Sequence, residues 1–302
     1  MFSIIPANSK STPSPQRGIF AFGTTASGKT SISNLVSSSG VVASNTTGVG
    51  TARSRVGAAT YGGDKAIFGY GEIASEAGVS MTNLVSNSGV VASDVSGVGT
   101  ARKNLEAVKY GTDKAIFGYG TAGSYSSLTN LVTNLGVVGN DVTGVGTARE
   151  ELAAASYGGD KAMFGYGYNG NLIGVTNKVS NSGVVASDTT GVGTSRRQLA
   201  ACSFGGDKSI FGYGYNDSSQ LSMTNIVSNS GVVASDVSGV GTARRLLTAC
   251  GFGGDKGIFG FGWSSYLSMT NLVSSSGVVA SDVSGVGTAR RAPGAASFSL
   301  TA

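Results

Sequence analysis

The chain has no histidine, and this absence excludes much of ordinary enzyme chemistry. Histidine is the side chain that normally titrates near neutral pH, the usual general base of nucleophilic triads and the commonest metal ligand. The chain also has only two cysteines, too few for a cysteine-based metal site. We therefore expect a protein that is not an enzyme and that binds no metal or other cofactor.

Charged residues are scarce as well, at 12% of the chain, and long hydrophobic runs are lacking. No run approaches the roughly 18 apolar residues of a membrane-spanning helix, and the first residues lack the basic-then-apolar order of a secretion signal. The formal net charge of +5 is spread along the chain, because lysines such as Lys65 and Lys114 directly follow an aspartate. Nucleic-acid binding needs a one-sided basic surface, so we expect neither membrane insertion nor a nucleic-acid partner.

Glycine, in contrast, is abundant, with 49 residues, many of them within a repeat. The string GVGTAR occurs almost unchanged six times, and its arginines lie 46 to 49 residues apart. Repeats of this length are typical of β-propeller blades. The repeated arginines are Arg53, Arg102, Arg149, Arg196, Arg244 and Arg290.

Each repeat has four segments with the composition of short β-strands. In one repeat they are the small-residue run at 57–61, AIFGYG at 66–71, TNLVS at 82–86 and GVVASD at 89–94. Glycine-containing turns separate the first segment from the second and the third from the fourth. We therefore predict an all-β fold built from four-stranded blades.

The ends of the repeat array predict a closed ring. The first AIFGYG-like segment, Gly18–Gly23, has no small-residue strand before it, whereas GAASF at 294–298 follows the last arginine without a partner. Pairing the two would complete the sixth blade and remove two exposed sheet edges. We predict a six-bladed β-propeller over residues 18–302, preceded by an extended arm at residues 1–17 that is either disordered or tied to a neighbouring subunit.

Repeated polar residues are interpreted as structural. The aspartate of GVVASD recurs with the arginine of GVGTAR, with Asn45 as the one exception. We expect the aspartate to accept backbone hydrogen bonds in a turn and the arginine to fill the seam between blades. Cys202 and Cys250 share one repeat position, where most other repeats have alanine, so they are either small buried residues or a disulfide between neighbouring blades.

Two patterns bear on catalysis. GTTASGKT at 23–30 matches the phosphate-binding loop GxxxxGK[ST], which works where a strand feeds a glycine loop that opens a helix. The residues that follow align with strands of the other repeats, so we interpret the match as a coincidence. The remaining basis for catalysis is the set of carboxylates outside the repeat pattern. They are Glu72, Glu76, Glu106, Glu150, Glu151 and Asp217.

Sequence variation concentrates in the loop between the second and third strands and in the residues after each repeated arginine. In a four-stranded meander these segments share a face. We therefore expect one face to carry nearly identical turns in all six repeats and the other to carry loops that differ between repeats. Aromatic residues beside Asn and Asp can stack on a sugar or anchor a protein; the alternative is loop variation without selection for binding. The candidate binding residues are Tyr125, Tyr168, Asn169, Asn171, Tyr215, Asn216, Asp217, Trp263 and Tyr266.

The repeat resembles the kelch repeat: an arginine, a small-residue strand, a strand ending in glycine, a variable loop, an Asn-led strand and a fourth strand leading to the next arginine. This resemblance covers Gly18–Phe298 and implies a propeller that binds a partner; a weaker one is to regulator-of-chromosome-condensation-like repeats. The tract TNLVSNSGVVASDVSGVGTAR is also similar to repeats of uncharacterised structural proteins of tailed bacteriophages. That similarity implies a virion protein of the tail, a fibre or the capsid.

We therefore expect a non-enzymatic structural or adhesion protein of a phage particle, assembled in the host cytoplasm. Its expected partners are other virion proteins, bound through residues 1–17, and a host surface glycan at the variable face. The alternative is an intracellular kelch-like adaptor that binds a protein or peptide.

Overall fold

The structure, a computed structural model, describes residues 16–300, and its regular elements are all β-strands. In this part of the chain 20 strands form seven small antiparallel sheets, and no helix occurs. Accordingly, no helix long and apolar enough to cross a membrane is found among these residues. The all-β prediction is confirmed.

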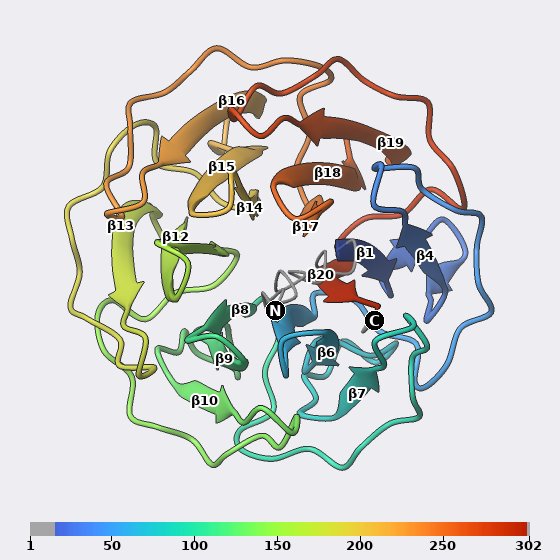
Figure 1. The fold of residues 1–302 in the computed structure, drawn as a ribbon. Helices are drawn as coiled ribbons and strands as arrows, with labels where there is room; N and C mark the ends of the chain where they lie inside the picture. The colour runs from blue at the N-terminus through green and yellow to red at the C-terminus, as the bar shows by residue number, and fades with distance from the viewer. Residues whose placement is uncertain (1–15, 301–302) are drawn as a thin grey trace, which may run out of the picture.

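Six of the sheets have three strands each, and each strand comes from an equivalent position of the repeat. The inner strands in Figure 1 are β20 (Gly294–Ser299), β5 (Gly57–Tyr61), β8 (Glu106–Tyr110), β11 (Ala153–Tyr157), β14 (Ala200–Phe204) and β17 (Thr248–Phe252). The middle strands are β1 (Gln16–Ala21), β6 (Lys65–Gly69), β9 (Lys114–Gly118), β12 (Lys161–Tyr168), β15 (Lys208–Tyr215) and β18 (Lys256–Trp263). The outer strands are β4 (Ser33–Val36), β7 (Thr82–Val85), β10 (Thr129–Val132), β13 (Leu172–Val179), β16 (Gln220–Val227) and β19 (Tyr266–Val273). The seventh sheet is the hairpin of β2 (Thr24–Thr25) and β3 (Gly28–Lys29).

The six three-stranded sheets stand around a common axis, and each inner strand packs against the inner strands of its two neighbours (Figure 1). Because each sheet lies between two others, the middle strands are buried on both sides, and after the first residue, Lys65, the sequence AIFG of β6 is continuously apolar. At each of the six seams, side chains of adjacent sheets form one apolar cluster; in the first, Phe68 packs with Ile19 and Phe298. Each fully buried side chain of this size stabilises the fold by about 1.5–3 kcal/mol.

The two ends of the described chain pair with each other. Strands β1 and β20 are antiparallel, with Gln16 opposite Ser299 and Ala21 opposite Gly294. The predicted pairing of the terminal strands is therefore confirmed. The predicted boundary of the arm at residue 17 is wrong, because Gln16 and Arg17 already belong to β1; the rest of the predicted arm, 1–15, lies outside the described residues.

The predicted fourth strand of each repeat does not form as a continuous strand. Instead the segment makes two isolated bridges to the outer strand, for example Val42 with Val36 and Thr46 with Ser33. The register shifts by one residue between these bridges, because the side chain of Asn34 inserts there and donates to a backbone carbonyl of the segment (3.0 Å). A side-chain donor thus replaces a backbone donor, and the segment bulges.

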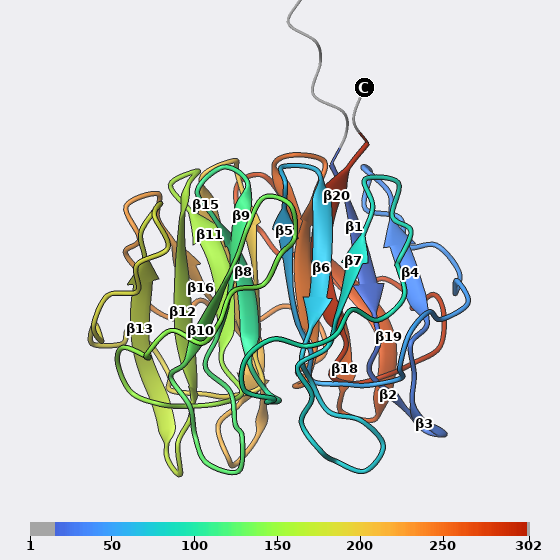
Figure 2. The same cartoon turned by 90° about the horizontal axis from the view of Figure 1, so that it is seen from below.

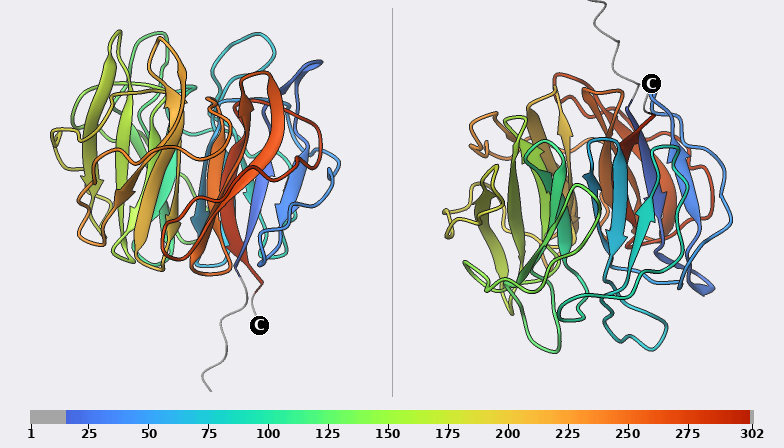
Figure 3. Two further views of the ribbon diagram at one scale, coloured as in Figure 1. Left: turned by 90° about the horizontal axis from the view of Figure 1, so that it is seen from above. Right: turned by 60° about the horizontal axis from the view of Figure 1, so that its bottom comes forward.

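The two faces of the ring carry different connections (Figure 2). On one face the tight turns between inner and middle strands are hydrogen-bonded in a circle, as where the amide of Gly62 donates to the carbonyl of Asp113 in the next turn (2.7 Å). Gln16 and Ser299 complete this circle where the chain ends replace a turn. The longer hairpins, such as β12–β13, and the segments after the repeated arginines lie on the opposite face (Figure 3), as predicted. We call this the variable face.

Candidate functional site

The repeated arginines are fully buried at the seams. Arg53 donates from Nε to the carbonyl of Tyr70 (2.9 Å) and from Nη2 to Oδ1 of Asn83 (2.5 Å), both in the following sheet. Its guanidinium lies 4.2 Å from the ring centroid of Phe22 in the preceding sheet. Burial lowers the pKa of Arg53 to about 10, so the side chain stays charged at neutral pH. The predicted role of this arginine in filling the seam is confirmed.

The aspartate that completes the tie comes from the next repeat. Asp94 accepts hydrogen bonds from the amide (2.9 Å) and hydroxyl (2.7 Å) of Thr51 and from Nδ2 of Asn83 (2.9 Å), and lies 3.5 Å from Nη1 of Arg53. Although partial burial acts to raise it, the pKa of Asp94 is held below its usual value by these hydrogen bonds. Asp94 therefore pairs across the seam and not with Arg102, which is nearer in sequence.

One seam lacks this carboxylate. In the sheet formed by the chain ends, Asn45 replaces the aspartate and accepts from the amide of Thr288 (3.1 Å). Within residues 16–300 the Nε of Arg290 is buried without a partner, and its Nη2 reaches the carbonyl of Phe20 at 3.5 Å. The amide oxygen of Asn34 is also buried without a partner. Burial without a counter-charge lowers the pKa of Arg290 to about 9.

The second residue after each repeated arginine belongs to a ring around the axis on the variable face. All six have φ between 50° and 57°, the left-handed region that non-glycine residues rarely adopt. Backbone hydrogen bonds between successive members offset this strain, as where Gln198 donates to Glu151 (2.8 Å) and Leu246 to Gln198 (2.9 Å). Their side chains line a common cavity at the end of the axis. The ring consists of Arg55, Asn104, Glu151, Gln198, Leu246 and Ala292.

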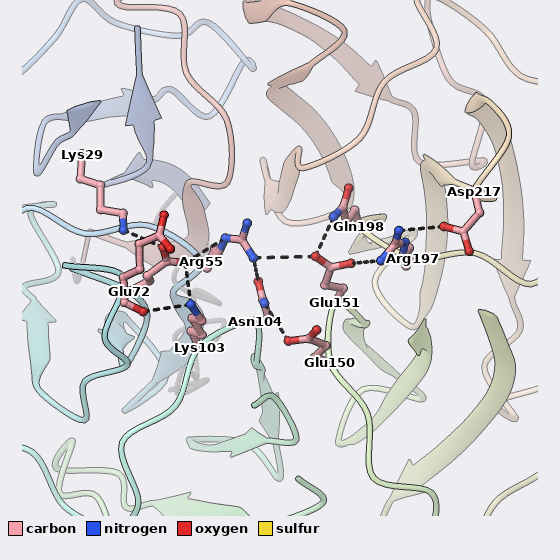
Figure 4. Close-up of polar contacts among 11 residues, drawn as sticks. Lys29, Arg55, Glu72, Lys103, Asn104, Glu150, Glu151, Arg197, Gln198 and Asp217 are labelled. Carbon is pink, nitrogen blue, oxygen red and sulfur yellow. Dashed lines mark hydrogen bonds and ion pairs between the residues drawn. The ribbon is translucent and has the colours of Figure 1, made fainter. Parts of the chain in front are cut away.

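Polar side chains of this ring form a connected cluster (Figure 4). Glu151 accepts from Nε2 of Gln198 (2.6 Å) and Nη1 of Arg197 (3.3 Å), and lies 3.8 Å from Nη1 of Arg55. Arg55 also donates to Oδ1 of Asn104 (2.9 Å). Burial raises the pKa of Glu151, although Gln198 and Arg197 act in the opposite direction.

A second carboxylate, Glu72, extends the cluster outward. It binds Nζ of Lys29 at 2.8 Å, Nε of Arg55 at 3.1 Å and Nζ of Lys103 at 3.5 Å. Partial burial acts to raise its pKa, but the three cations hold the pKa of Glu72 below its usual value. Cations from three repeats thus converge on one carboxylate.

The segment that matches a phosphate-binding loop folds as the β2–β3 hairpin. No helix follows it, so the helix N-terminus that would hold phosphates is missing from this part of the described chain. Lys29 donates instead to Glu72 and to the carbonyl of Ile73.

A third carboxylate lies inside the ring. Glu106, the first residue of β8, lines the narrow cavities along the axis together with apolar residues such as Ala58, Ala154 and Leu247. Burial in these surroundings raises the pKa of Glu106 to about 8. Three of the carboxylates outside the repeat pattern, Glu72, Glu106 and Glu151, therefore lie along the axis or near its variable end.

The candidate aromatic residues lie on the same face at three successive seams. In each seam the residue directly after the repeated arginine is itself an arginine, which stacks on the last residue of the preceding middle strand. The stacked pairs, with their distances from guanidinium carbon to ring centroid, are Arg197 on Tyr168 (4.3 Å), Arg245 on Tyr215 (4.3 Å) and Arg291 on Trp263 (4.8 Å).

Two further aromatic candidates extend these stacks. Tyr125 packs edge-on against Tyr168, with centroids 6.2 Å apart, and Tyr266 packs edge-on against Trp263 at 4.8 Å. Asp217 forms an ion pair with Arg197 (2.8 Å). The structure thus brings the aromatic candidates and Asp217 onto one arc of the variable face.

The asparagine candidates have local roles. Asn169 accepts through Oδ1 from the amide of Asn171 (3.3 Å), and Asn216 accepts in the same way from the amide of Ser219 (2.8 Å). Both side chains shape the turns of their own hairpins, as short polar side chains commonly do. The expectation that these asparagines face a ligand therefore gains no support from their contacts.

Cys202 and Cys250 are free and buried, so the alternative of a disulfide is not realised. Each thiol packs against a glycine of the next sheet. A methyl carbon at Gly257 would lie 2.5 Å from Sγ of Cys202, and one at Gly18 would lie 2.6 Å from Sγ of Cys250. Burial raises the pKa of both thiols, which keeps them protonated.

No protein-family model matches the chain, and no curated protein is similar to it at a significant level.

Sequence reasoning missed the arginine partners of the aromatic residues and the polar cluster at the axis. A signal for both was present. Arg197, Arg245 and Arg291 directly follow repeated arginines, and the clustered carboxylates are those outside the repeat pattern. Neither signal specifies that these residues meet, because their partners come from neighbouring repeats.

Proposed function

We propose that this chain is a six-bladed, kelch-like β-propeller that serves as a non-enzymatic structural and binding component of a bacteriophage particle. The propeller architecture is supported by six equivalent sheets around one axis and by the pairing of β1 with β20 (Figure 1). Each three-stranded sheet, with its bulged outer segment, corresponds to one four-stranded blade.

The observation that carries the binding role is the separation of repeated from unrepeated polar residues. Repeated side chains such as Arg53, Asn83 and Asp94 bond to one another within the seams. Unrepeated charged side chains gather around the end of the axis on the variable face (Figure 4). Unrepeated aromatic side chains lie on the same face, stacked under arginines. The repeated seam residues are needed in every repeat to hold the sheets together. The unrepeated residues on the variable face have no such structural role, so this face is the proposed binding surface.

Assignment to a virion is supported by the similarity of the repeated tract to structural proteins of tailed phages. The interlocked backbone bonds on both faces fit such a role, because they make the ring rigid. The proposed partners are neighbouring virion proteins and a host surface glycan.

Proteomic analysis of purified particles of the phage that encodes this chain tests the virion assignment. Its peptides are expected in a constant ratio to the major capsid protein after density-gradient purification. An intracellular adaptor would be missing from the particles and would be recovered from the lysate with a host protein, and that result would refute the assignment.

The binding face is tested by attachment of the chain to host cells. Tyr215→Ala combined with Trp263→Ala is expected to reduce attachment, whereas Lys161→Ala combined with Lys208→Ala on the turn face is expected to leave it unchanged. Unchanged attachment of the first variant, with a normal melting temperature, would show that binding occurs elsewhere.

A further inference from the structure

Two arginines on the variable face have no acidic partner. Within residues 16–300 the side chains of Arg245 and Arg291 make only ring-stacking contacts. The equivalent Arg197 is neutralised by Glu151 (3.3 Å) and Asp217 (2.8 Å). Arg245 and Arg291 therefore form a cationic region beside a seam in which the charge of the equivalent arginine is neutralised.

Each of the two arginines stacks on an aromatic ring, and the two stacks are joined through the backbone of Arg245 and Trp263. Arg245 is bonded through its backbone to Trp263 (2.7 and 3.1 Å) and stacks on Tyr215 at 4.3 Å. Arg291 stacks on Trp263 at 4.8 Å and lies 5.8 Å from the centroid of Tyr266. Stacking fixes the plane of each guanidinium and leaves its N–H groups free to bind a carboxylate in the same plane. We call Tyr215, Arg245, Trp263, Tyr266 and Arg291 the arginine–aromatic clamp.

Unpaired buried atoms lie in the same place. The Nε of Arg245 is buried without a hydrogen-bond partner among the described residues, and so is Oε1 of Gln220, which lies opposite Tyr215 in the β15–β16 pair. Buried polar atoms are nearly always hydrogen-bonded. The equivalent Nε of Arg197 is also unpaired within the described part of the chain, so the acceptor of Gln220 is the atom that distinguishes this seam, and it indicates a ligand with a hydroxyl donor. A sugar acid offers a carboxylate acceptor and hydroxyl donors.

We propose that the arginine–aromatic clamp binds an acidic carbohydrate, with carboxylates on Arg245 and Arg291, which stacks on Trp263, and a sugar ring against Tyr266. This inference rests on the proposed function of the variable face and names the class of glycan. A neutral glycan would leave both guanidiniums unpaired. A nucleic acid would need open ring faces for its bases and a longer basic track, but arginines cover Tyr215 and Trp263.

Fluorescence titration of the full chain tests the proposal, because Trp263 is its only tryptophan. Galacturonic acid hexamer and sialic acid hexamer are the acidic probes, and maltohexaose is the neutral one. At least one acidic probe is expected to change Trp263 fluorescence saturably, and maltohexaose is not. Arg245→Gln combined with Arg291→Gln is expected to weaken binding at least tenfold. Lys114→Gln combined with Lys161→Gln removes the same charge from the turn face and is expected to leave binding unchanged.

Four results would overturn the inference: no response to either acidic probe, calorimetric binding without a change in Trp263 fluorescence, equal weakening in the lysine control, or equal affinity for a single-stranded oligonucleotide. Attachment to host cells without binding of acidic probes refutes this inference alone. If the chain neither attaches to host cells nor binds the acidic probes, the proposed binding face is refuted as well. If the double variant fails to melt cooperatively, Arg291→Gln alone provides the same test.

Discussion

The buried asparagine of each TNLV segment holds three parts of the molecule together. Asn83 accepts from Arg53 (2.5 Å) and donates to the carbonyl of Ala92 (2.9 Å) and to Asp94 (2.9 Å). It therefore joins the seam arginine to the outer segment and to the aspartate. A single residue type at one repeat position thus sets both the contact between sheets and the bulge at the rim.

The exception at Asn45 allows the contribution of the carboxylate to be measured. Asn45→Asp is expected to stabilise the protein by about 1 kcal/mol, because it gives the buried Arg290 a counter-charge on a partly exposed site. Asp236→Asn, which removes the equivalent carboxylate near Arg196, is expected to destabilise by a similar amount. Urea denaturation provides both values. A destabilising Asn45→Asp would mean that this seam is shaped for the neutral side chain.

Glu106 gives the protein a specific dependence on pH. Its folded-state pKa of about 8 lies above its ordinary value of 4.5, so the folded state holds this proton more tightly than the unfolded state. The stability it contributes is present below about pH 4.5 and is lost as pH rises toward 8. Glu106→Gln is therefore expected to be more stable than the wild type at pH 9 and to lack this part of the pH dependence.

Urea midpoints at pH 5, 7 and 9 measure this effect, with Glu76→Gln on the variable face as the matched control. Parallel profiles for Glu106→Gln and the wild type would contradict the placement of this carboxylate inside the ring.

At the scale of strands, the sequence predicts three of the four segments of each repeat and their pairing. The fourth, GVVASD, has the composition of a strand, but Asn34 and its equivalents insert between it and the outer strand. In the other repeats the arginine of a neighbouring repeat also holds the asparagine oxygen, as in Asn130 with Arg102, whereas Asn34 inserts without this contact. Local composition carries no information about that contact.

For the candidate site, the sequence predicts the face on which the aromatic residues lie but not their contacts. Loop variation places Tyr215, Trp263 and Tyr266 on the correct face, because strand order alone fixes which loops share it. Their coverage by Arg245 and Arg291 depends on how neighbouring sheets pack, and no local pattern reports it.

The paired cysteine and glycine positions predict non-additive effects of substitution. Gly257→Ala is expected to destabilise the protein by about 1–3 kcal/mol, because its methyl group would overlap Sγ of Cys202. Adding Cys202→Ala is expected to recover most of this loss, since other seams have alanine at both positions, as in Ala59 and Ala115. Thermal melts of the two single variants and the double variant measure the coupling. Additive changes would show that the two side chains do not compete for the same space.

At the scale of the whole molecule, the ring depends on one strand from its far end. Strand β20 covers the edge of β1, and its residues Ala295, Ala296 and Phe298 belong to the apolar clusters of two seams. Without β20 the ring would have an open sheet edge and two incomplete seams, and an open edge favours association between chains.

Removal of residues 293–302 is therefore expected to abolish the cooperative melt and to produce oligomers in light scattering. Because β20 pairs along its whole length, a peptide of residues 293–300 is expected to restore a monomer that melts cooperatively. The same peptide with Phe298→Ser is expected to fail, since this side chain fills the seam with Phe68 and Ile19. A truncated chain that stays monomeric with an unchanged melting temperature would show that the remaining five sheets and β1 are stable without closure, and that pairing of the chain ends is dispensable for the fold.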